Sequence, residues 1–111
     1  MSSDQGFIEF VTDQIESAGT ITSKKMFGEY AVYCDGKVVA LVCDNKLFVK
    51  PTESGRKFIG VVTEAPAYPG AKPAFLIEDQ LDDREWISNL IKITCSELPE
   101  PVIRKKKKDR G

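Results

Sequence analysis

The sequence contains no histidine. Histidine is the commonest general base and the commonest metal ligand in proteins, and it activates the nucleophile in Ser-His and Cys-His pairs. Its absence argues against most hydrolytic and metal-dependent enzymes, so we expect a protein that is not an enzyme. The glycines are isolated and lack the spacing of a phosphate-binding loop. Nucleotide binding through a Walker or dinucleotide motif is therefore excluded.

Cysteine is scarce and widely spaced, at Cys34, Cys43 and Cys95. This set forms neither the disulfide framework of small secreted proteins nor the paired knuckles of a structural zinc site. A turn at Asp35-Gly36 would separate Cys34 from Cys43 along neighbouring strands, so we expect no bond between them. We expect reduced thiols, no bound metal or cofactor, and a cytoplasmic protein. A small enzyme that uses a cysteine or carboxylates is the least favoured alternative.

Long apolar runs are also absent. The longest nearly unbroken one, residues 38–43, is far shorter than the roughly 20 residues that span a bilayer. No basic signal region is evident either, and we expect no membrane contact. Hydrophobic residues make up 41% of the chain and charged residues 30%, which suits one folded domain, predicted over 1–103.

The net charge of −1 hides a strong asymmetry. Residues 1–103 carry ten basic and sixteen acidic groups, a net charge of −6, and such a body repels a phosphate backbone. We predict that 104–111 is a disordered basic tail and favour a solvated end over a recognition element. Any contact with nucleic acid would begin there, weakly and without sequence preference. The basic residues of this tail are Arg104, Lys105, Lys106, Lys107, Lys108 and Arg110.

Apolar residues at helical spacing predict two main helices, over 4–18 and over 82–97. Gly19 is placed to end the first helix. Acidic residues cluster at the start of the second, where capping and the helix dipole favour them. A short helix within 53–62 has weaker support because this segment contains two glycines.

Residues 26–50 predict three strands of an antiparallel meander, with the apolar strand 37–43 in its centre. The two tight turns between them are Asp35-Gly36 and Asp44-Asn45. A proline- and glycine-rich loop over 66–73 precedes a further short strand over 74–77. We therefore predict an α+β fold in which an antiparallel β-meander of three strands and a further short β element pack against N-terminal and C-terminal helices.

Aromatic residues gather in the meander, where Tyr30, Tyr33 and Phe48 join Met26 and Phe27. Lysines lie nearby, at positions 24, 25, 46 and 50. In some proteins such aromatic residues stack on the bases of single-stranded nucleic acid, and such lysines bind its phosphates. A three-stranded sheet must also bury one face, and these are its largest apolar groups. We favour burial and keep, as the alternative, a nucleic-acid-binding module that uses the basic tail and the sheet aromatics.

The stretch from 23 to 51 resembles the most recognisable segment of the N-terminal domain of the TfoX/Sxy family of bacterial competence regulators. In that family basic residues precede Met-Phe-Gly, an aromatic strand and an Asp-Gly turn follow, and a Leu-aromatic-Leu/Val-Lys strand closes the meander. The matching residues here are Lys25, Met26, Phe27, Gly28, Tyr30, Tyr33, Asp35, Gly36, Leu47, Phe48, Val49 and Lys50. We interpret them as structural or interaction residues.

The resemblance implies a stand-alone, non-enzymatic regulatory or adaptor domain that acts through protein contacts. Family members switch on competence genes together with a cyclic-AMP receptor-type activator, so the implied partner is a transcription regulator, and a second copy of the chain is a further candidate. Longer members carry a second, helical domain where this sequence reads RKKKKDRG. We expect an exposed sheet edge or the aromatic loop around Tyr68 to be the interaction surface.

Overall fold

The computed structural model describes residues 5–26 and 29–98, which form α-helices, short 3-10 turns and a single six-stranded sheet. Phe27, Gly28 and the predicted tail lie outside the described residues. In chain order the elements are α1 (Gln5–Gln14), η1 (Glu16–Ala18), β1 (Ile21–Met26), β2 (Glu29–Cys34), β3 (Lys37–Cys43), β4 (Lys46–Val49), α2 (Glu53–Ile59), β5 (Glu64–Pro66), β6 (Pro73–Ile77), η2 (Asp79–Asp82) and α3 (Arg84–Glu97).

The sheet has the strand order β1-β2-β3-β4-β6-β5, and every neighbouring pair is antiparallel. The predicted α+β fold is confirmed, and the strand expected over 74–77 lies beside β4 as β6. The sheet also contains β1 and β5, which extend the predicted set of strands at its two edges. β1 reads ITSKKM and is exposed along most of its length, so it lacks the apolar alternation that marks a half-buried strand.

Both predicted turns have the backbone conformation that two-residue hairpins require. Asp35 and Gly36 have φ values of 53° and 84°, and Asp44 and Asn45 have values of 54° and 57°. Positive φ at both central residues gives the turn a twist that matches the flanking strands. The turns thereby set the register of β3 with β4, and that of β2 with β3 as far as the register shift between Tyr33 and Val32.

Both main helices form within their predicted segments, and the start of the second has an identifiable cap. The segment predicted over 4–18 is α-helical only to Gln14 and continues as the 3-10 turn η1. In the segment predicted over 82–97, α3 begins after Asp83, whose carboxylate accepts a hydrogen bond from the Trp86 backbone N–H at 3.1 Å. This is the N-cap that the acidic cluster indicated.

The short helix α2 forms within 53–62 despite its glycines. Thr52 caps it, since the Thr52 hydroxyl accepts a hydrogen bond from the Gly55 N–H at 3.0 Å, and Gly60 ends it with a φ of 88°. Gly55 is buried, and a Cβ there would stand 2.6 Å from the Thr52 Oγ1, so its lack of a side chain leaves room for the capping hydroxyl. The local penalty of glycine is thus offset by the cap.

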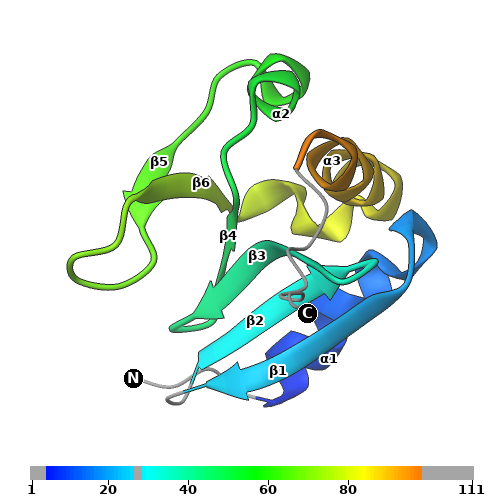
Figure 1. Ribbon diagram of the computed structural model, residues 1–111, viewed down its shortest axis with the longest axis vertical. Coiled ribbons are helices and arrows are strands. Elements are labelled where there is room, and N and C mark those ends of the chain that lie inside the picture. The colour runs from blue at the N-terminus through cyan, green and yellow to red at the C-terminus, as the bar shows by residue number, and fades with distance from the viewer. Residues whose placement is uncertain (1–4, 27–28, 99–111) are drawn as a thin grey trace, which may run out of the picture.

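The core lies between one face of the sheet and helices α1 and α3, which Figure 1 shows on the same side of the sheet. A row of buried residues in register runs across this face: Val32, Ala40, Val49 and Phe75. The helices cover it with Ile8, Val11, Ile15, Ile87, Leu90 and Ile91. No helix of the described chain covers the opposite face, which we call the helix-free face.

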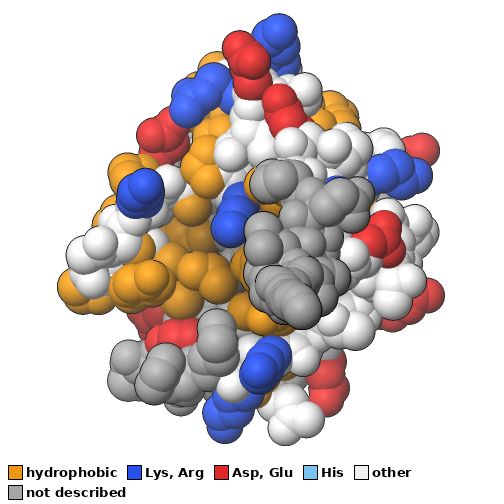
Figure 2. Space-filling model, viewed as in Figure 1, with side chains coloured by type: hydrophobic (Ala, Val, Ile, Leu, Met, Phe, Trp, Pro, Cys, Tyr) orange, Lys and Arg blue, Asp and Glu red, His pale blue; other side chains and the backbone are white. Residues whose placement is uncertain are grey.

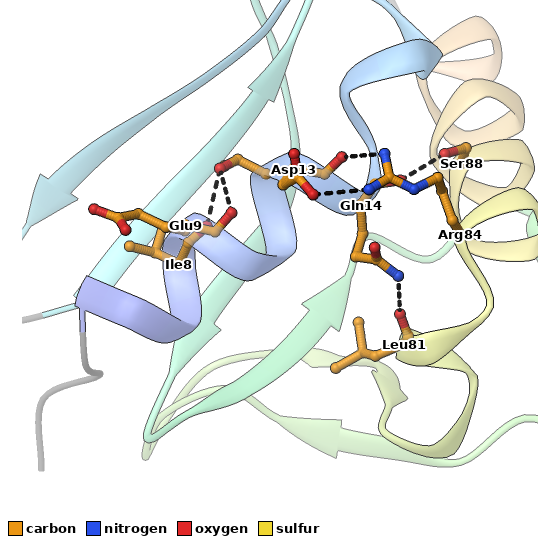
Figure 3. Close-up of polar contacts among 8 residues, drawn as sticks. Ile8, Glu9, Asp13, Gln14, Leu81, Arg84 and Ser88 are labelled. Atoms are coloured by element: carbon orange, nitrogen blue, oxygen red, sulfur yellow. Dashed lines mark hydrogen bonds and ion pairs between the residues drawn. The ribbon is translucent and has the colours of Figure 1, made fainter.

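Polar contacts fasten α1 to the start of α3 (Figure 3). The Gln14 side-chain amide donates to the Leu81 carbonyl at 2.7 Å, and the Ser88 hydroxyl donates to the Gln14 carbonyl at 2.8 Å. Arg84 bridges Asp13 at 2.8 Å on the surface. The buried bonds contribute more to this junction than the exposed ion pair, because removing one partner would leave a buried polar group unpaired.

Candidate functional site

A groove of about 400 Å³ lies on the helix-free face, between β4 and the loop that joins β5 to β6. Its lining includes Leu41, Phe48, Lys50, Tyr68, Lys72 and Pro73, and we call it the aromatic groove. Figure 2 shows hydrophobic side chains gathered on this face over β4 and the β5–β6 hairpin. Contiguous apolar surface of this kind marks binding sites on many proteins.

The floor of the aromatic groove follows from strand alternation. Leu41 and Phe48 face each other in the register of β3 and β4, and Leu76 continues the row on β6. Their neighbours along each strand point into the helix-side core, so these three point to the helix-free face. Phe48 is only 6% exposed, because residues of the β5–β6 loop share the groove with it.

The rim of the aromatic groove is a tight turn that holds Tyr68 outward. Pro69 and Gly70 are its central residues, Gly70 has a φ of 88°, and the Ala71 N–H donates to the Tyr68 carbonyl at 3.0 Å. Proline followed by glycine at positive φ is the signature of a type II turn. Tyr68 is 53% exposed, so a large aromatic side chain borders the groove with much of its surface in solvent.

The charge around the aromatic groove is positive. Of the described residues that line it, the charged ones are Lys50 and Lys72, and both are exposed. They lie on a body whose sequence carries a net charge of −6 over 1–103. A local basic patch beside an apolar surface favours a ligand that combines apolar and acidic groups.

The residues that carry the family resemblance do not form one cluster. Tyr30 packs against the core, Leu47 is buried within it, and Gly36 completes the β2–β3 turn. Asp35 accepts a hydrogen bond from the Thr20 N–H at 2.9 Å and so ties that turn to the segment before β1. These four residues have structural duties.

Phe48 and Lys50 are the motif residues that the structure brings to the aromatic groove. Lys25 and Met26 end β1, away from it in the strand order. The loop around Tyr68 was expected as an interaction surface from its exposed aromatic residue. Lys72 and Leu41 were not expected at an interaction surface, because the sequence does not indicate that the loop after β5 returns to β3 and β4.

Two of the sheet aromatics, Tyr30 and Phe48, lie on opposite faces of the sheet. Tyr30 contacts the helix-side core, whereas Phe48 lies on the helix-free face and is almost fully covered. Stacking of successive bases needs exposed rings along one track. The expectation that these residues serve mainly in packing is therefore supported for Tyr30 and Phe48, and the basic tail lies outside the described residues.

All three cysteines are free and buried. Burial raises the pKa of Cys34 to about 12, and burial together with the nearby Glu29 carboxylate raises that of Cys43 to about 11. Both thiols therefore keep their protons at neutral pH. Cys34 pairs with Lys37 in the register of β2 and β3, whereas Cys43 lies at the other end of β3, so the two are not placed to bond, as expected.

Cys34 instead has Cys95 as its neighbour, a proximity that the sequence could not show. The two sulfurs and an Asp35 carboxylate oxygen lie within 4.8 Å of one another. Structural zinc takes four ligands, so this group is one donor short and we assign no metal to it.

No helix in residues 5–26 or 29–98 is long and apolar enough to cross a membrane. The family model of the TfoX N-terminal domain matches residues 13–98. A Spirochaeta aurantia protein described as an uncharacterized 12.7 kDa protein in the trpE 5' region is 37% identical over 107 residues, which cover 96% of this chain and 93% of that protein. Its description assigns no activity.

Proposed function

The chain belongs to the TfoX N-terminal domain family, and we propose on that basis that it is a non-enzymatic regulatory domain that acts by binding a protein partner. The observation that carries the proposal is the aromatic groove on the helix-free face. It combines an apolar floor that includes the nearly buried Phe48, an exposed Tyr68 and two lysines. Exposed tyrosine next to a desolvated apolar surface is typical of residues that anchor protein contacts.

The chemistry of the groove defines the partner segment that suits it. The partly exposed Leu41 and Tyr68 can contact an aliphatic or aromatic side chain, while the exposed Lys50 and Lys72 can pair with carboxylates near it. The matching ligand is a protein segment in which an apolar residue is flanked by acidic ones. Its apolar part supplies affinity, and its charges supply orientation and association rate.

The family resemblance supports a transcription regulator as the partner and competence-type gene control as the outcome. The acidic body argues against direct binding to the DNA phosphate backbone through residues 1–103. Contact with a DNA-bound protein avoids this repulsion. The domain then acts in the cytoplasm as an adaptor on that regulator.

A photochemical capture experiment tests this assignment. Benzoylphenylalanine replaces Tyr68 at the groove or, as a control, Lys57 on the exposed side of α2. Irradiation of cells that carry each version should trap a protein at position 68 that is not trapped at position 57. Mass spectrometry identifies it, and the purified partner is then used for binding measurements with the full chain.

Charge reversal provides the decisive comparison. We expect Lys50→Glu with Lys72→Glu to weaken binding of that partner by about tenfold or more, whereas Lys57→Glu with Lys92→Glu leaves it nearly unchanged. Equal affinities for both double variants would refute the groove as the binding site. Capture of nucleic acid instead, lost when the chain ends at Leu98, would support the alternative module.

A further inference from the structure

Cys34 and Cys95 meet although they are 61 positions apart in the sequence. Cys34 is the last residue of β2, and Cys95 lies in the last turn of α3. Their sulfurs are within 4.8 Å of each other, and the Cys95 thiol donates to the Cys34 carbonyl at 3.3 Å. A modest rotation of the two side chains would bring the sulfurs to bonding distance.

The surrounding backbone keeps the two thiols facing each other. The Cys34 thiol donates to the Ala18 carbonyl at 3.8 Å, and a Cβ placed on Gly19 would stand 2.8 Å from the Cys34 sulfur. On the other side, the Lys37 ammonium donates to the carbonyls of Cys95 and Leu98 at 2.9 and 3.2 Å. These contacts fix the end of α3 against the end of β2.

We propose that Cys34 and Cys95 are a site of reversible disulfide formation, oxidised by hydroperoxides such as hydrogen peroxide and reduced again by dithiols. First, the Cys95 sulfur attacks a peroxide oxygen, the O–O bond breaks, and the products are a Cys95 sulfenic acid and water. Next, the Cys34 sulfur attacks the sulfenic sulfur, the S–O bond breaks, and the hydroxyl group leaves as water with the Cys34 proton. The two thiols lose two electrons, and these reduce the peroxide.

The order of the two steps follows from access and charge. Cys95 is 7% exposed whereas Cys34 is fully buried, so a dissolved oxidant reaches Cys95 first. Burial, the contact with Cys95 and the Asp35 carboxylate raise the pKa of Cys34, and the Lys37 ammonium lowers it. Cys34 therefore stays a thiol until the sulfenic acid forms beside it. Closure should then accelerate as the pH rises.

The bond would join the end of a strand in the sheet to the end of the last helix. It closes a long loop of chain, which restricts the unfolded state and stabilises the folded one. The helix α3 would then be unable to leave β2 without reduction. Cys43 has no such neighbour among the cysteines, because it lies at the opposite end of β3 from the β2–β3 turn.

Peptide analysis tests the proposal on the full chain. The reduced protein, freed of reductant, is treated with hydrogen peroxide, alkylated without reduction and digested with trypsin. Trypsin separates the cysteines into peptides 26–37, 38–46 and 93–104. We expect a disulfide that links 26–37 to 93–104, lost on treatment with dithiothreitol, and an alkylated Cys43. We also expect oxidation to raise the Tm by roughly 8–16 °C.

Matched variants complete the experiment. Cys43→Ser should form the linked peptide and show the same rise in Tm, whereas Cys95→Ser should show neither, with circular dichroism confirming that each variant is folded. Separate alkylated peptides 26–37 and 93–104 after full peroxide exposure would overturn the proposal. So would a disulfide that uses Cys43 or that joins two copies of the chain.

Discussion

Cys34 illustrates how burial and neighbouring charge act on a single side chain. Its pKa, 9.0 in an ordinary thiol, is raised to about 12, first by burial and then by Cys95 and the Asp35 carboxylate, with Lys37 opposing. Between pH 9 and about pH 12, Cys34 has lost its thiol proton in the unfolded chain but keeps it in the folded chain. Stability contributed by the neutral thiol is therefore complete below about pH 9 and is lost as the pH rises toward 12.

Replacing Cys34 should reveal this contribution. We expect the free energy of unfolding of the reduced wild-type protein to fall more steeply between about pH 8 and pH 10.5 than that of Cys34→Ala, because the variant lacks the shifted group. Urea denaturation in the presence of a phosphine reductant measures both slopes. Parallel slopes would show that the Cys34 thiol ionises in the folded state as it does in the unfolded state.

Single residues also mark where sequence reasoning stops. Asp35 and Gly36 could be placed in a turn because only a few residue types accept positive φ. The approach of Cys95 to Cys34 could not be foreseen, since it depends on where α3 ends over the sheet. That position is set by packing of the whole helix face, which no local pattern encodes.

Among the elements, the last helix was predictable from the sequence, whereas the edge strands were not. Its apolar spacing and acidic start were sufficient to predict α3, and the N-cap lies at Asp83. The edge strands were harder, because β1 is largely exposed and β5 spans only Glu64–Pro66. Such edge strands form because an adjacent strand supplies backbone hydrogen-bond partners. Hydrophobic periodicity in the sequence does not reveal which strand lies next to them.

The cap of α3 can be measured directly. We expect Asp83→Ala to lower the free energy of unfolding by about 1 kcal/mol, because it removes the acceptor of the Trp86 N–H. Asp82→Ala removes an adjacent negative charge but leaves the cap in place and should cost clearly less. Chemical denaturation of both variants would show equal losses if the helix dipole, and not the capping bond, were responsible.

The whole molecule divides into a helix-covered side and a helix-free face, on which we propose that the partner binds. The helix-covered side holds the large core of aliphatic residues, which the composition and the helical spacing of apolar residues predicted. The other side gains its groove only when the β5–β6 loop returns over β4, so Tyr68 meets Phe48 and Lys50 through tertiary structure. The sequence could therefore suggest an aromatic loop as an interaction surface, but not the groove that this loop completes.

The most direct test of this account follows transcription in the source organism. A strain that lacks the gene is complemented with the wild-type chain, with Lys50→Glu/Lys72→Glu, or with the control Lys57→Glu/Lys92→Glu, each confirmed to be folded and equally abundant. Sequencing of RNA should show that the wild-type and control chains restore the transcripts altered by the deletion and that the groove variant does not. Full restoration by the groove variant, or no transcript change on deletion, would contradict a regulatory role for the aromatic groove.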